Sequence, residues 1–179
     1  MARKTSASKF VARKTGKKVP SVHLCIGSNI DAKQNLELAL NELQKRFGEL
    51  DKSSVYRSKA YGFDGDDFLN MVVALHSALT PTEIYEQLED IQRIFGRNRE
   101  ARGYASRTLD IDLLLYDDLV IDQPPIRLPR ADVLRFSFVL GPLAEIAAEL
   151  RHPETHQSYQ EHWNNFDTDS HPITREFVI

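Results

Sequence analysis

Residues 106–118 read SRTLDIDLLLYDD and place two carboxylates, Asp110 and Asp112, inside an otherwise apolar run. The apolar span is eight residues long and is bounded by turn-forming residues, which predicts a buried β-strand. Side chains alternate between the two faces of a strand, so both aspartates should lie on one face and the apolar side chains around them on the other. Because like charges side by side repel, this strand indicates more than core packing.

The sequence before this strand predicts a strand, a helix and two further strands. Residues 22–26 (VHLCI) form a short apolar run, and leucines at helical spacing follow it between residues 36 and 47, up to Gly48. Residues 53–61 (SSVYRSKAY) and 68–79 (FLNMVVALHSAL) are rich in β-branched and aromatic residues. The loop between them, GFDGDD, consists mostly of turn formers, so it should separate two strands.

A second helix is predicted from Thr80 onward. Thr80 suits the N-cap, Pro81 the first helical position, and Glu83 can complete a capping box. Apolar residues then recur at helical spacing over residues 84–95, and Gly96 ends the pattern.

The resulting order, βαββαβ, is typical of an α+β, ferredoxin-like fold, in which two helices cover one face of an antiparallel sheet. Residues 130–150 predict an extra C-terminal helical segment over another face. At 179 residues the chain is expected to form one domain. We predict a basic, disordered leader over residues 1–20, a domain over residues 21–166 and a tail over residues 167–179.

Charge is distributed unevenly along the chain. The net charge of −3 combines seven basic groups within residues 1–20 with 16 basic and 26 acidic groups elsewhere, a balance of −10. A leader of this kind could be a nucleic-acid-binding arm or a transit peptide, but a disordered extension is the simpler interpretation. Four of the six histidines lie in residues 152–171 without the spacing of a metal site.

The single cysteine, the short apolar runs and the first residues of the chain together indicate a cellular location. The single cysteine, Cys25, lies in an apolar segment, which fits a buried thiol in a reducing compartment. No apolar run is long enough to span a bilayer, and the first residues lack the apolar block of a secretory signal. We therefore predict a cytoplasmic protein without membrane association and, as its simplest state, a monomer.

The chemistry predicted from the residues is phosphate chemistry with a metal. Two neighbouring carboxylates suit Mg²⁺, particularly when a substrate phosphate completes the shell. Four arginines precede them within eleven residues: Arg97, Arg99, Arg102 and Arg107. Guanidinium groups match phosphate oxygens in pairs. The alternative interpretation is that the arginines lie on an ordinary solvated loop and the aspartates on the solvated face of an edge strand. The three leucines after Asp112 argue against such an edge strand.

Several motifs in this order and spacing resemble the 6-hydroxymethyl-7,8-dihydropterin pyrophosphokinase family of folate biosynthesis. They are GSN at 27–29, YRS at 56–58, FLN at 68–70, GRNR at 96–99, YASRTLDIDLLLY at 104–116 and FVLGPLAEIA at 138–147. The resemblance covers about residues 22–150. It implies transfer of a diphosphate from ATP to the hydroxymethyl group of a reduced pterin, with AMP as leaving group.

The resemblance also implies a role for individual residues on the phosphate side. Asp110 and Asp112 would bind two Mg²⁺ ions that bridge the ATP phosphates, and Arg97 and Arg107 would stabilise charge on the moving diphosphate. The residues assigned to ATP are Arg99, Tyr104, Gln92 and Arg130.

On the acceptor side, the resemblance implies that Phe68 and Phe138 stack on the two faces of the pterin. Asn70 would hydrogen-bond to its edge, and Ser58 and Tyr61 would contribute to the same wall. Without the resemblance, both phenylalanines would be interpreted as ordinary core residues.

The chain departs from the family pattern mainly where ATP phosphates are held. Arg130 stands in place of the usual histidine, Phe136 in place of an arginine, and Gln92 in place of a glutamate. The usual glycine-proline pair is Ala105-Ser106, and the usual threonine-x-proline of the pterin wall reads 58–60 SKA.

These departures leave more than one function open. The first is an active pyrophosphokinase, because the carboxylates and both charge-stabilising arginines are kept. The second is a weakened or inactive pterin-binding paralogue with an altered ATP clamp. The third, a nucleic-acid-binding module, is disfavoured by the acidic body and by the absence of aromatic RNA-recognition strands.

Overall fold

A single antiparallel sheet forms the centre of the molecule. The computed structural model describes residues 18–96 and 105–179. Its six-stranded sheet has the order β5-β1-β4-β3-β8, with β2 paired to β4, and all neighbours are antiparallel. The strands are β1 (Ser21–Ser28), β2 (Asp51–Lys52), β3 (Val55–Ser58), β4 (Phe68–His76), β5 (Asp110–Tyr116) and β8 (Ile173–Phe177).

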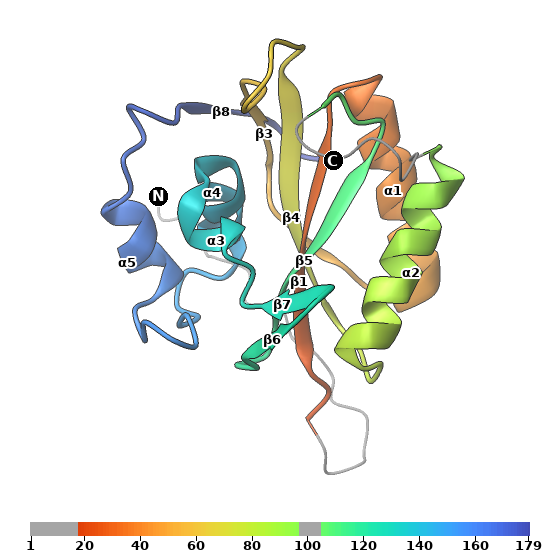
Figure 1. Ribbon diagram of the computed structural model, residues 1–179, viewed down its shortest axis with the longest axis vertical. Helices are drawn as coiled ribbons and strands as arrows, with labels where there is room; N and C mark the ends of the chain where they lie inside the picture. Colours follow the sequence, from red (N-terminus) through yellow and green to blue (C-terminus); the bar gives the residue numbers. More distant parts are fainter. Residues whose placement is uncertain (1–17, 97–104) are drawn as a thin grey trace, which may run out of the picture.

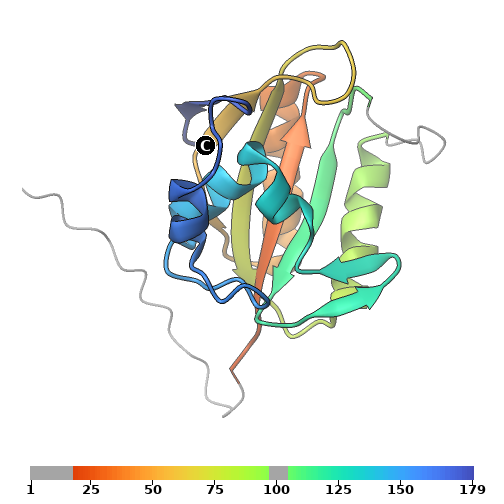
Figure 2. The same ribbon diagram turned by 60° about the vertical axis from the view of Figure 1, so that its left-hand side comes forward.

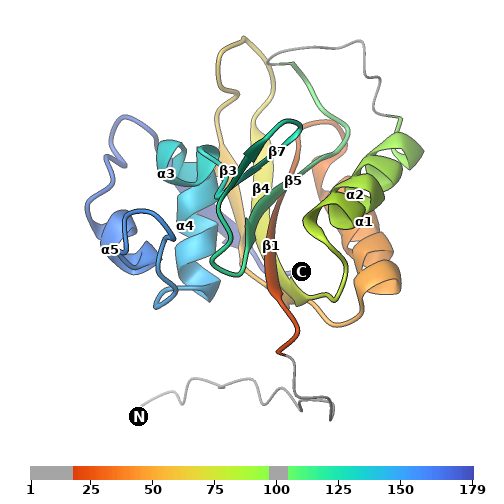
Figure 3. The ribbon, with the colours of Figure 1, turned by 60° about the horizontal axis from the view of Figure 1, so that its bottom comes forward.

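Helices cover both faces of this sheet, which gives three layers (Figures 1 and 3). One face carries α1 (Ala32–Phe47) and α2 (Pro81–Ile94). The other carries α3 (Asp132–Arg135), α4 (Ser137–Ile146) and α5 (Tyr159–Asn164). The predicted ferredoxin-like order is confirmed, and so is the additional C-terminal helical cover.

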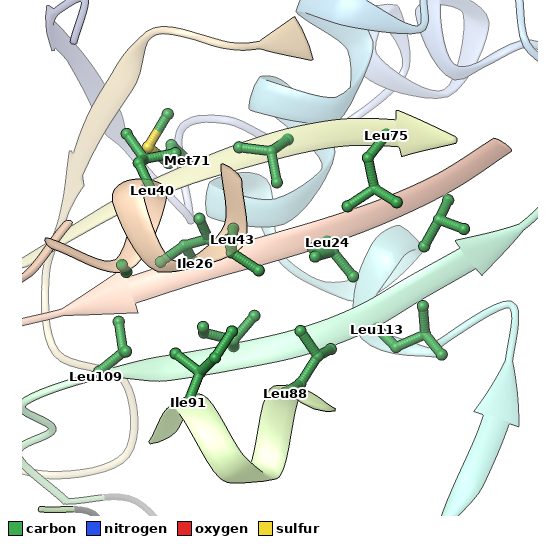
Figure 4. Close-up of a cluster of buried hydrophobic side chains, with 14 of the residues drawn as sticks. Leu24, Ile26, Leu40, Leu43, Met71, Leu75, Leu88, Ile91, Leu109 and Leu113 are labelled. Atoms are coloured by element: carbon green, nitrogen blue, oxygen red, sulfur yellow. The ribbon is translucent and has the colours of Figure 1, made fainter. Parts of the chain in front are cut away.

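Strand alternation explains the larger core, which lies between the sheet and helices α1 and α2 (Figure 4). Leu24 and Ile26 of β1 point to this side, and Leu109 and Leu113 flank the two aspartates. Each is at most 6% exposed. Burying aliphatic side chains of this size stabilises the fold by about 1.5–3 kcal/mol each.

Helix α2 begins as the sequence predicts. The Thr80 side chain accepts a hydrogen bond from the backbone N–H of Glu83, and the Glu83 carboxylate accepts one from the backbone N–H of Thr80, with Pro81 in the first turn. This capping box satisfies N–H groups that a helix start otherwise leaves without partners.

The second core lies between the opposite face of the sheet and α3, α4 and α5. Cys25 of β1 and Val72 of β4 belong to it, together with Leu140 and Leu143 of α4. The predicted burial of the Cys25 thiol is confirmed. This core does not reach the edge of the sheet where β1 ends and where β4 and β5 begin. The strand residues on this face of that edge line a cavity instead.

Two additions were not predicted from the sequence. A hairpin of β6 (Ile121–Gln123) and β7 (Ile126–Leu128) projects from the β5 edge of the sheet and contacts both β5 and α2 (Figure 2). Strand β8, within the predicted tail, pairs with β3 and extends the sheet past the boundary predicted at residue 166. No helix in the described part of the chain has the length and apolar character that a membrane span requires.

Candidate functional site

The site is built on one row of residues across the sheet. Asp110 of β5 pairs with Gly27 of β1, which pairs on its other side with Asn70 of β4. Asp112 and Cys25 form the next pair on the same face. The aspartates, the glycine, the asparagine and the cysteine all line a cavity of about 370 Å³. The predicted common orientation of the two aspartates is thus present in the structure.

Aromatic side chains form much of the wall of this cavity, which is the larger of two that Asp112 lines. Phe68 and Phe138 both line it, as do Tyr61, Phe63 and Phe136. Phe136 stacks on Phe138 with ring centroids 4.9 Å apart, and Tyr61 meets Phe136 edge to face at 4.9 Å. Phe63 contacts Phe68 edge to face at 6.3 Å. A cavity with several exposed ring surfaces suits a flat heterocyclic ligand.

A polar pair lies at the base of this wall. The Asn70 amide nitrogen donates a hydrogen bond to the Ser58 hydroxyl at 2.9 Å, and both residues are buried. Gly27 permits this arrangement, since a Cβ atom at that position would lie 2.8 Å from Asn70 Oδ1. The amide is therefore held in place by its neighbours and lies where it can pair with the edge of a ligand.

Arg130 reaches into the carboxylate end of the cavity. Its Nη2 lies 3.3 Å from Asp112 Oδ1, and its Nε donates to Asp132 Oδ2 at 2.6 Å. Burial opposes the charged form of Arg130, but the neighbouring carboxylates outweigh it and raise the pKa of the guanidinium. Burial first, and then Asp112 and Asp110, raise the pKa of Cys25, and Arg130 opposes this rise.

The GSN motif fixes the segment that carries Arg107, a role that sequence reasoning missed. The Asn29 side chain accepts from the backbone N–H of Arg107 at 2.7 Å, and its backbone N–H donates to the Arg107 carbonyl at 3.0 Å. The Ser28 hydroxyl donates to the Thr108 carbonyl at 2.7 Å. Apart from the family resemblance of the motif, the sequence signals this role only by small polar residues at the end of a buried strand, which also fit an ordinary turn.

A smaller cavity of about 170 Å³ lies between α2, β5 and the β6–β7 hairpin. Its lining is mainly polar, with a smaller apolar part from Leu88, Ile111 and Leu128, and Asp112 and Arg130 line it as well as the larger cavity. The two cavities therefore share Asp112 and Arg130 in their walls.

Gln92 also lines the smaller cavity, but it is only 2% exposed. Its side-chain oxygen accepts a hydrogen bond from the backbone N–H of Ile111 at 3.0 Å, and its amide nitrogen donates to the Leu88 carbonyl at 3.3 Å. Gln92 thus fastens α2 to β5 between the two aspartates.

The structure brings together most of the residues predicted for the site. The larger cavity is lined by Ser58, Tyr61, Phe68, Asn70, Arg107, Asp110, Asp112, Arg130 and Phe138. Arg97, Arg99, Arg102 and Tyr104 lie outside the described residues. The individual roles of all these residues stay predictions.

The donor set fits a magnesium ion that arrives with phosphate. Asp110 and Asp112 are half-buried carboxylates facing the cavity, and carboxylate oxygens are the ligands that hard divalent cations prefer. Within residues 18–96 and 105–179, no three His, Cys, Asp or Glu side chains converge as a metal site on their own. Mg²⁺ commonly takes one or two carboxylates and fills its shell with water and substrate phosphates.

Comparison with protein families identifies the same region of the chain. Residues 23–148 match the family model described as 7,8-dihydro-6-hydroxymethylpterin-pyrophosphokinase. The matched segment begins in β1 and ends just after α4, so it contains both cavities.

Two curated relatives cover most of the chain. A protein of Aquifex aeolicus named 2-amino-4-hydroxy-6-hydroxymethyldihydropteridine pyrophosphokinase is 34% identical over 135 residues, 74% of this chain and 84% of the relative. A protein of the same name from Porphyromonas gingivalis is 38% identical over 139 residues, 74% of this chain and 94% of the relative.

Solved structures support the fold. A Plasmodium falciparum HPPK-DHPS variant crystallised with pterin and p-hydroxybenzoate superposes with a TM-score of 0.72 over 93% of this chain at 12% identity. An HPPK-DHPS structure in complex with substrates gives a TM-score of 0.68 over 83% of this chain, also at 12% identity. This chain spans slightly less than half of those proteins, 49% and 43%.

Proposed function

The chain belongs to the 7,8-dihydro-6-hydroxymethylpterin-pyrophosphokinase family, and we propose that its two adjoining cavities hold the two substrates of the family's reaction. The reaction transfers a diphosphate from ATP to 6-hydroxymethyl-7,8-dihydropterin in folate biosynthesis. The hydroxymethyl oxygen forms a bond to the β-phosphorus while the bond from that phosphorus to the oxygen shared with the α-phosphate breaks. AMP leaves with that oxygen, and the hydroxyl proton passes to solvent.

The larger cavity takes the pterin. Stacking between Phe68 and Phe138 would bury both faces of the heterocycle and add offset-stacking energy, about 0.5–1.5 kcal/mol for each aromatic pair. Asn70 offers both donor and acceptor atoms to the polar edge of the ring, and Ser58 fixes its orientation. Tyr61 completes the wall through its contact with Phe136.

The smaller cavity takes part of the nucleotide. Its lining is mainly polar, with a smaller apolar part from Leu88, Ile111 and Leu128, and Gln92 fixes the β5 side of this wall through its hydrogen bond to Ile111. Since Arg130 lines both cavities, it stands where a phosphate chain running from one cavity to the other would pass. Arg107 also lines the larger cavity, where it would neutralise charge on the diphosphate as it moves.

Asp110 and Asp112 would hold two Mg²⁺ ions against the phosphates. When bound, the metal withdraws charge from the phosphate oxygens and orients them. The protein contributes the position of the carboxylates, which β1 and Gln92 fix from two sides.

One observation carries the proposal: Asp112 lines both the larger cavity and the smaller cavity, so one proposed metal ligand borders both proposed substrate sites. A pterin-binding paralogue without chemistry is not favoured, because relatives at 32–38% identity carry the name of the enzyme. The monomeric state and the cytoplasmic location stay predictions.

The test is single-turnover formation of AMP and pterin diphosphate from ATP, Mg²⁺ and the reduced pterin. Asp112→Asn should lower the rate by about 10²–10³-fold, as losses of electrostatic transition-state stabilisation do. Asp118→Asn, in the exposed turn after β5, makes the same chemical change away from both cavities and should leave the rate unchanged. Equal turnover by Asp112→Asn and wild type would contradict the proposed metal site.

A further inference from the structure

Arg130 is anchored beside the proposed metal site by contacts on several sides. It lies between β7 and α3, and its backbone N–H donates to the Leu114 carbonyl of β5 at 2.9 Å. Its Nε bonds Asp132 at 2.6 Å, which leaves the outer end of the guanidinium directed at Asp112, 3.3 Å away. The Arg130 guanidinium is therefore held between the carboxylates of Asp132 and Asp112.

The pairing of Arg130 with Asp112 occupies a group that the proposed function assigns to metal. A carboxylate oxygen that faces a guanidinium at ion-pair distance is less available to a divalent cation, and the two cations repel each other. Arginine also has a natural second partner here, because its planar fork matches phosphate oxygens in pairs. Asp132 can continue to hold Nε of Arg130 while the outer end of the guanidinium moves from Asp112 to a phosphate group.

We propose that Arg130 is a competing cation at Asp112, which weakens metal binding to the nucleotide-free protein and is transferred to the ATP phosphates when metal and nucleotide enter together. This inference rests on the proposed function, since it takes Asp112 as a metal ligand. If Arg130 competes in this way, productive metal binding depends on the presence of nucleotide. The Arg130 side chain is 39% exposed, so solvent screening limits the effect to about tenfold in affinity.

The proposal predicts opposite changes in two affinities, which a purely structural role for Arg130 would not produce. Arg130→Met should bind Mn²⁺ about tenfold more tightly without nucleotide, because the competing charge is gone. The same variant should bind the Mn²⁺–ATP complex about tenfold more weakly, because the phosphate contact is gone. Loss of the Asp132 anchor alone would weaken both or change neither.

The experiment measures free Mn²⁺ by electron paramagnetic resonance during titration of the full chain, first without and then with ATP. Arg130→Lys keeps a charge on the same segment and should retain the low metal affinity of the wild type. Arg93→Met removes an exposed arginine that pairs with Asp90 on α2 and should change neither affinity. Unfolding by urea checks that each variant is folded.

Two results would overturn the inference in different ways. Unchanged or weaker Mn²⁺ binding by Arg130→Met, with binding lost in Asp112→Asn, would remove the competing role and leave the metal site standing. Mn²⁺ binding by Asp112→Asn as tight as in the wild type would show that the metal lies elsewhere, which overturns the proposed metal ligand and this inference together.

Discussion

The side-chain oxygen of Gln92 accepts a hydrogen bond from the backbone N–H of Ile111 at 3.0 Å, at the residue between the two aspartates. Contrary to the argument from the three leucines after Asp112, β5 is an edge strand of the sheet; it is nevertheless buried, because helices cover both faces and its aspartates line a cavity. The glutamine supplies an acceptor on the side where a further strand would lie. Helix α2 thereby fixes the strand that carries the proposed metal ligands.

Gln92→Met should therefore destabilise both the fold and the metal site. The substitution conserves size but leaves a buried N–H without its acceptor, which costs about 1–3 kcal/mol in the free energy of unfolding. Mn²⁺ binding should weaken as well, because the strand loses a support between Asp110 and Asp112. Urea denaturation and metal titration measure the two effects. Gln44→Met, on the exposed side of α1, is the control and should stay within about 0.5 kcal/mol of the wild type.

Gly27→Ala should weaken pterin binding without affecting metal binding. The new Cβ would lie 2.8 Å from Asn70 Oδ1, so the amide must move away from the position that Ser58 fixes. We expect about a tenfold increase in the Kd of the pterin, measured by fluorescence quenching. In an Asn70→Ala background the same glycine substitution should cost much less, since the colliding atom is absent. An equal loss in both backgrounds would contradict this explanation.

The sequence predicts the layered core well because its signals are local. Alternation along residues 109–113 separates leucines from aspartates, and the capping box at Thr80 marks the start of α2. These patterns depend on residues a few positions apart, which the chain's own geometry brings together. The same logic places Asp110 and Asp112 on one face before any tertiary structure is considered.

Partners distant in the sequence could not be predicted in the same way. From the sequence, Gln92 is predicted to be an ordinary polar residue of a helix, but in the fold it hydrogen-bonds to Ile111. Arg130 is predicted to be a basic residue of a loop, but its position directly after β7 brings it to Asp112. Strand β8 carries few apolar residues, so it gives no clear alternation, and its position depends on the free edge of β3. Each of these contacts is set by packing rather than by local propensity.

Glu145→Ala should weaken the attachment of the C-terminal strand β8 to the sheet. The Glu145 carboxylate of α4 accepts hydrogen bonds from the backbone N–H and hydroxyl of Ser54, from the Tyr56 hydroxyl and from Arg175 of β8. Ser54 is only 1% exposed, so losing its acceptor should cost about 1–3 kcal/mol of unfolding free energy. Hydrogen exchange at residues 173–177 should accelerate.

The matched control for this network is Glu176→Ala. Glu176 forms a solvent-exposed pair with Arg57, and such pairs contribute only about 0–1 kcal/mol. Equal acceleration of exchange in both variants would show that Glu145 has no particular role in holding β8.

His23 should make the protein less stable as the pH falls. Burial, reinforced by His76 and opposed by Asp117, lowers its pKa to about 4 from an ordinary value of 6.5. Between these two values the unfolded chain binds a proton that folded His23 does not, so stability declines from pH 7 toward pH 4, by about 2 kcal/mol at pH 5. Urea denaturation at pH 7 and pH 5 measures the decline, which His23→Leu should reduce by that amount. His156→Asn, at an exposed histidine with a φ of 60° that asparagine tolerates, should retain the wild-type decline. An unchanged pH dependence in His23→Leu would show that His23 is not the group responsible.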